Sequence, residues 1–79
     1  MPHQRFLIEK ELTGLAKRFR KNSGITRAQA ARDMGVAQTS VFHAEESPHQ
    51  SFVKLRVRMI EKYSQFKVVG AVYFLKRKR

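Results

Sequence analysis

Residues 24–46 read GITRAQAARDMGVAQTSVFHAEE, and this stretch decides the fold. Small and apolar residues recur in it at helical spacing, on both sides of a central glycine. Thr26 is followed three residues later by glutamine, a capping-box pattern that is typical of a helix N-terminus. The stretch therefore predicts a short helix over about Arg27–Asp33, a turn over 34–36, and a second short helix over about Gln38–Glu46.

Two short helices that cross through a tight turn place demands on particular positions. The first helix needs a small residue at the crossing, and the turn needs a residue that tolerates positive φ. Ala31 and Gly35, four residues apart, meet these needs. The buried face requires apolar side chains, which stand at Ala30, Met34, Val36, Val41 and Ala44. The outer face of the second helix is left largely polar.

The rest of the chain predicts two more helices and a strand. Apolar residues at helical spacing indicate helices over about Phe6–Asn22 and Phe52–Tyr63, the second with Ser51 as its cap. Residues 66–75 are rich in β-branched and aromatic side chains and predict a strand. The fold class is therefore mostly α, with four helices and a C-terminal strand. We expect one domain with two parts, a helical core over 6–63 and a strand with a basic tail over 64–79.

Composition restricts the function more than it does the fold. The chain has 79 residues, no cysteine and a formal net charge of +11. Such an excess of positive charge favours a polyanionic partner, above all nucleic acid. The three histidines are scattered, and the sequence shows no nucleophile–base pair or phosphate loop. We therefore expect no metal site, no cofactor, no small-molecule substrate and no enzymatic activity. Without a signal-peptide pattern or a run of about 20 apolar residues, a soluble cytoplasmic protein is expected.

The run Gly24–Glu45 resembles the Cro/C1-type helix-turn-helix repressor family, also called the XRE family. Members commonly show Gly-Leu-Thr-Gln-x-x-Leu-Ala-x-x-Leu-Gly-Val-Ser-x-x-x-Ile/Val-x-x-x-Glu over this span. The resemblance covers about residues 12–63 and puts the helix-turn-helix at 27–46. It implies a lambda-repressor-like fold and a sequence-specific transcriptional regulator of phage or bacterial type that binds double-stranded DNA, expected to be a repressor. Ala37 departs from the usual serine cap, and Glu46 from the usual asparagine near phosphate.

The resemblance also implies roles for individual residues. The second helix of the motif would lie in the major groove. Base contacts are expected from Gln38, Thr39, Phe42 and His43. Phosphate contacts are expected from Arg27, Ser40, Lys54 and Arg56. Phe42 would otherwise meet a partner protein or join the core, and His43 would otherwise face solvent. Arg20 and Glu45 fall where some members form a buried ion pair between the first and third helices.

The C-terminal strand needs a mate for its backbone. The segment Val68–Leu75 is predicted to pair with its copy across a two-fold axis, as in some Cro-type repressors, giving a homodimer. The interface would include Val68, Val69, Val72, Tyr73 and Phe74. The alternative mate lies within the chain, at Arg5–Ile8. A dimer would place two recognition helices about 34 Å apart, which matches a pseudo-palindromic operator.

Two other functions remain open from the sequence. An antitoxin-like subunit would bind DNA through the same motif and a toxin through the C-terminal strand. A small RNA-binding protein would also suit the net charge of +11. The chain lacks the aromatic sheet positions and glycine loops of common RNA-binding modules, which makes duplex DNA the better-supported partner.

Overall fold

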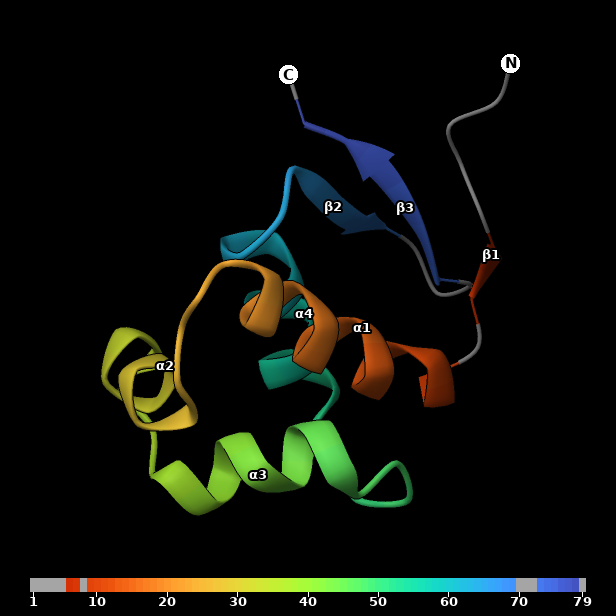
Figure 1. Ribbon diagram of the computed structural model, residues 1–79. Coiled ribbons are helices and arrows are strands. Elements are labelled where there is room, and N and C mark those ends of the chain that lie inside the picture. The colour runs from red at the N-terminus through yellow and green to blue at the C-terminus, as the bar shows by residue number, and fades with distance from the viewer. Residues whose placement is uncertain (1–5, 8, 70–72, 79) are drawn as a thin grey trace.

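The computed structural model describes residues 6–7, 9–69 and 73–78 (Figure 1). Four helices dominate it, as the sequence predicts: α1 (Glu9–Asn22), α2 (Arg27–Met34), α3 (Gln38–Glu46) and α4 (Val53–Lys62). The first helix begins later than predicted, because Phe6–Leu7 forms a short strand instead. The fourth begins at Val53 without a side-chain cap, so the prediction of Ser51 as its cap is wrong. None of these described helices is long and apolar enough to cross a membrane.

Small side chains let the four helices approach one another closely. Ala16 on α1, Ala30 on α2 and Ala44 on α3 have no exposed surface. Larger apolar residues fill the space between α1 and α4, with Leu12 facing this core from α1. The other fully buried apolar side chains come from α3 and α4, at Val41, Met59 and Ile60. Each fully buried side chain of this size stabilises the fold by about 1.5–3 kcal/mol relative to exposure.

The turn between α2 and α3 follows from two residues. Thr26 caps α2, and its side chain accepts a hydrogen bond from the N–H of Gln29 at 3.1 Å. At the other end Gly35 has φ 69°, in the left-handed region that favours glycine, and its N–H donates back to the α2 carbonyls. The chain can therefore leave α2 and enter α3 after only three residues. Ala37 precedes α3 without a side-chain cap, as expected for alanine.

The C-terminal segment is two strands, not one. β2 (Phe66–Val69) and β3 (Tyr73–Arg77) pair antiparallel, with Val68 opposite Leu75. β1 (Phe6–Leu7) pairs with the other side of β3, so the strand order is β1-β3-β2. The prediction of a single strand is therefore wrong, and β1 lies within Arg5–Ile8, the alternative mate that the sequence offered inside the chain. The homodimer itself stays a prediction. Pairing within the chain satisfies the strand backbone without the entropic cost of association.

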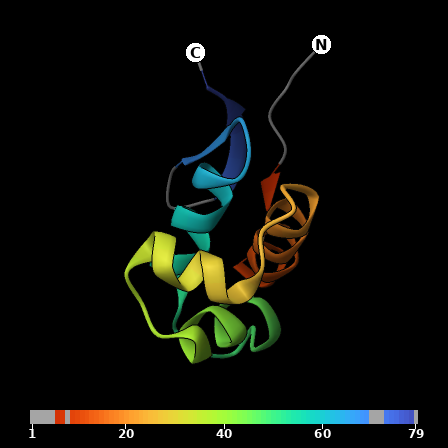
Figure 2. The ribbon, with the colours of Figure 1, turned by 60° about the vertical axis from the view of Figure 1, so that its left-hand side comes forward.

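This rearrangement changes the position of the predicted dimer residues. Val68 and Val69 lie in β2, whereas Tyr73 and Phe74 lie in β3. Val72 lies outside the described residues. The sheet packs against α4 through β2 and lies at the end of the molecule opposite α3 (Figures 1 and 2).

Side chains block the outer side of β2. The N–H of Val68 donates to Glu61 Oε2 at 3.0 Å, and the N–H of Phe66 donates to Ser64 Oγ at 3.0 Å. Both donors point away from β3, where they would otherwise be available to a further strand. Glu61 and Ser64 therefore reduce the ability of this edge to pair with another chain.

Glu61→Ala is expected to lower the free energy of unfolding by about 1 kcal/mol, because the N–H of Val68 loses its acceptor. The same change should increase self-association, since the β2 edge gains a donor. Urea unfolding and sedimentation velocity measure the two effects. Glu61→Gln is the matched control, because it removes the same charge but keeps an oxygen acceptor. Equal behaviour of the two variants would mean that the hydrogen bond does not protect the edge.

Candidate nucleic-acid interface

The outer face of α3 is the candidate binding surface. Its exposed residues are Gln38, Thr39, Phe42 and Glu46. α3 lies at the end of the molecule away from the sheet, and no described element covers this face (Figures 1 and 2). Phe42 has 44% of its surface exposed, and it is the one large hydrophobic residue of the described chain that stands out in this way.

His43 lies at the margin of this face rather than in its centre. Its Nδ1 is 3.0 Å from Ser47 Oγ, and its ring stacks on Phe52 at a centroid distance of 6.0 Å. The side chain is half-buried as a result. Of the predicted base-contacting residues, Gln38, Thr39 and Phe42 are thus presented most openly.

The predicted ion pair between α1 and α3 is present. Arg20 binds both oxygens of Glu45, with Nε at 2.5 Å from Oε2 and Nη2 at 3.0 Å from Oε1. Arg20 Nη1 also donates to the carbonyl of Ile25 at 2.7 Å. The side chain of Glu45 has no exposed surface, so this two-pronged contact compensates a fully buried charge. It holds the C-terminal end of α3 against α1.

One flank of α3 carries a second set of ion pairs that sequence reasoning missed. Arg27 Nε donates to Glu45 Oε1 at 2.9 Å, and its Nη2 pairs with Glu46 Oε2. Lys17 Nζ lies 2.7 Å from the same Glu46 oxygen. The Arg27 guanidinium also lies over the Phe42 ring, 5.1 Å from its centroid. The predicted phosphate ligand Arg27 is therefore bound to two carboxylates of its own chain.

The charges on this flank reinforce one another. The hydrogen bond to Glu45 raises the pKa of Arg27 above its usual value. The hydrogen bond from Lys17 lowers the pKa of the Glu46 carboxyl, and the charge of Arg27 lowers it further. Arg27 and Glu46 therefore stay ionised through the neutral range. Their contacts join residues 18 to 29 positions apart, so no local sequence pattern announces them.

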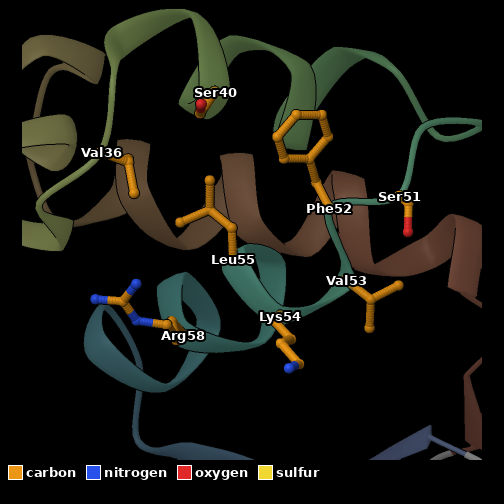
Figure 3. Close-up of a pocket in the computed structure, with 8 residues that line it drawn as sticks. All are labelled: Val36, Ser40, Ser51, Phe52, Val53, Lys54, Leu55 and Arg58. Atoms are coloured by element: carbon orange, nitrogen blue, oxygen red, sulfur yellow. The ribbon is translucent and has the colours of Figure 1, made fainter.

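The other flank of α3 borders an open cavity of about 610 Å³ (Figure 3). Its floor is apolar, with Val36, Phe52 and Leu55 among the lining residues. Ser40 reaches it from α3, whereas the cationic side chains of Lys54 and Arg58 extend from α4. The remaining lining residues are Ser51 and Val53. The structure therefore brings the predicted phosphate ligands Ser40 and Lys54 together beside the uncapped N-terminus of α4.

Arg56 is predicted to contact phosphate, and the structure contradicts this prediction. It has no exposed surface, and its guanidinium donates to the carbonyls of Ala44 at 2.9 Å and Ser47 at 2.7 Å. These carbonyls belong to the end of α3, where backbone acceptors lack helical partners and the helix dipole favours a cation. Arg56 therefore fastens α4 to the C-terminus of α3 and is not available to phosphate. Arg58, two residues further along α4, is exposed, and its Nη2 donates to the carbonyl of Met34 at 2.9 Å.

The two flanks lie on different sides of the helix. An α-helix turns by about 100° per residue, so Ser40 and Glu45 are about 140° apart around α3. The buried Val41 and Ala44 lie within this arc, and the exposed face lies on the remaining, longer arc of about 220°. A ridge of Gln38, Thr39 and Phe42 is thus bordered by cations on each side, from α1 and α2 on one flank and from α4 on the other.

No protein-family model, curated protein or solved structure matches this chain. Within the described residues, no three His, Asp or Glu side chains are grouped in a way that would hold a metal ion. The geometry of the α3 face and its flanks is therefore the basis for inferring function.

Arg56→Ala is expected to lower the free energy of unfolding by about 3 kcal/mol or more, because two carbonyls at the end of α3 lose a buried charged donor. Lys54→Ala, an exposed cation on the same helix, should change stability by no more than about 0.5 kcal/mol. Urea unfolding followed by circular dichroism compares them. A near-neutral Arg56→Ala would contradict the structural role assigned to this arginine.

Proposed function

We propose that the protein is a sequence-specific DNA-binding transcriptional regulator that reads duplex DNA with α3. The observation that carries this proposal is the exposed α3 ridge with cations on both of its flanks, in a chain with a formal net charge of +11. A helix with side chains is about 10–12 Å across, which fits a major groove about 12 Å wide. The two flanks would then meet the phosphate strands that border the groove.

Each exposed residue of the ridge has a chemistry suited to a base edge. Gln38 at the N-terminal end of α3 can make two hydrogen bonds to adenine, a contact that discriminates by about 1–3 kcal/mol. Thr39 can bond a base edge or touch a thymine methyl. Phe42 supplies an apolar surface for a thymine methyl, with Arg27 stacked above it. His43 would contribute from the margin, after release from Ser47.

Phosphate contacts would come from the flanks. Ser40, Lys54 and Arg58 surround the open cavity on the α4 side. On the other side, Arg27 and Lys17 would serve once they leave Glu46. The ridge and the flanks would therefore have separate roles. The ridge would read the base sequence, and the flanks would supply the part of the affinity that depends on salt.

Repression through a homodimer on a pseudo-palindromic operator is part of the proposal, but a ribbon of β3 with its copy gains no support from the sheet. β2 pairs with β3 from Phe74 to Arg77, and β1 pairs with the other side of β3 at Tyr73 and Phe74. The same pairings give no support to a toxin contact through β3, which the antitoxin-like alternative needs.

Selection from a pool of randomised duplexes tests the proposal directly. The wild-type protein should enrich one short motif, and an inverted repeat of it would indicate a dimer. Gel-shift titration should then give much tighter binding to the enriched duplex than to a scrambled one of equal length. Enrichment of no sequence, or preferential binding of structured RNA in competition, would overturn the proposed function.

Gln38→Ala is expected to weaken binding to the enriched duplex about 5–100-fold and to leave scrambled DNA almost unaffected, because only a base contact is lost. Lys54→Ala should instead weaken both duplexes similarly and reduce the salt slope by about one unit. Fluorescence anisotropy over a range of salt concentrations separates the two patterns. Equal losses on both duplexes for Gln38→Ala would remove this residue as a base reader.

A further inference from the structure

Glu46 is an unusual residue for a surface that would bind DNA. The chain has only six acidic residues, and this one is exposed on α3 itself. Its Oε2 pairs with both Arg27 and Lys17, from two different helices. A single carboxylate oxygen thus holds two cations at the edge of the α3 ridge.

The arrangement resembles the way in which a phosphate oxygen would be held. Charge-assisted hydrogen bonds from arginine and lysine serve carboxylate and phosphate alike. Arg27 is only partly exposed, with its Nε on buried Glu45 and its Nη2 on Glu46. Its contact with Glu45 is structural, whereas Glu46 is accessible to solvent and can be displaced.

We propose that Glu46 is an internal competitor for DNA phosphate, which keeps Arg27 and Lys17 from contributing fully to non-specific binding. This inference rests on the proposed function, and it adds that the affinity for non-specific DNA is held down by the chain itself. A protein with such a net charge would otherwise bind any duplex through its phosphates, since non-specific affinity comes almost entirely from that term. Glu46 reduces the number of phosphates that the α1–α2 flank neutralises.

The consequence is a measurable change in salt dependence. Each additional phosphate contact steepens the slope of log K against log salt by about 0.9. If Arg27 and Lys17 are both released, the slope for random duplex should steepen by about one to two units. Affinity for that duplex should rise at moderate salt, because two cations become available without having to leave a carboxylate.

Asp33 provides a matched control. It is also exposed, lies on the neighbouring helix α2, and would lose one negative charge in Asp33→Asn. Its hydrogen-bond partners are neutral, the amide of Gln29 at 2.8 Å and the hydroxyl of Tyr63 at 2.7 Å. Glu46→Gln and Asp33→Asn therefore change net charge equally, but only the first releases cations from an ion pair.

The experiment measures binding of a random-sequence duplex by fluorescence anisotropy from about 50 to 200 mM salt, the range over which phosphate contacts change affinity strongly. Glu46→Gln should bind about 3–10-fold more tightly than wild type at the middle of this range, with the steeper slope given above. Asp33→Asn should change affinity less and leave the slope near its wild-type value. Circular dichroism of both variants checks that the fold is kept.

A double-mutant cycle with Lys17→Ala provides a second readout. In the wild type, where Glu46 competes for the ammonium group, Lys17→Ala should weaken random-duplex binding less than it does in the Glu46→Gln background. In the Glu46→Gln background the same change should weaken binding by several-fold. Equal effects of Lys17→Ala in both backgrounds, or equal slopes for Glu46→Gln and Asp33→Asn, would overturn the role of Glu46. Neither result would affect the proposed function, which fails only if wild type selects no duplex.

Discussion

The buried carboxylate of Glu45 is the constraint on which the arrangement of the helices depends. A charge without solvent contact is very costly unless it is paired and hydrogen-bonded. Arg20 from α1 binds both of its oxygens, and Arg27 from α2 binds one of them. Because this single group joins three helices, it sets how α3 is rotated about its own axis. The outward direction of Gln38 and Thr39 follows from that rotation.

Arg56 provides a second attachment near Glu45, at the same C-terminal end of α3. It supplies donors to the carbonyls of Ala44 and Ser47, which a helix end cannot satisfy itself. α3 is therefore held by an ion pair on one side and by a buried guanidinium at its C-terminus. The three-stranded sheet lies at the other end of the molecule and leaves α3 uncovered (Figure 2). A rigidly held helix with one open face is well suited to reading a surface of fixed shape.

Fewer cationic side chains are available to a partner near α3 than the net charge of +11 suggests. Arg20 and Arg56 are buried, and Arg27 and Lys17 are paired with carboxylates. Glu45 and Glu46, which are adjacent on α3, thus have different roles. Glu45 compensates cations in the interior, whereas Glu46 holds cations at the surface, where under the proposed function a polyanion would compete for them.

Local features of the sequence determined much of this structure. The four helices, the Thr26 cap and the positive φ at Gly35 were predictable, because each depends on residues a few positions apart. The ion pair of Arg20 and Glu45 was predicted only through the family resemblance. Tertiary structure alone decided the burial of Arg56, the pairing of Glu46 with Arg27 and Lys17, and the position of β3 between β1 and β2. These features depend on contacts between segments that are distant in the sequence. Each charge and each strand has several possible partners, and the packing of the helices decides which of them lies close enough to bind.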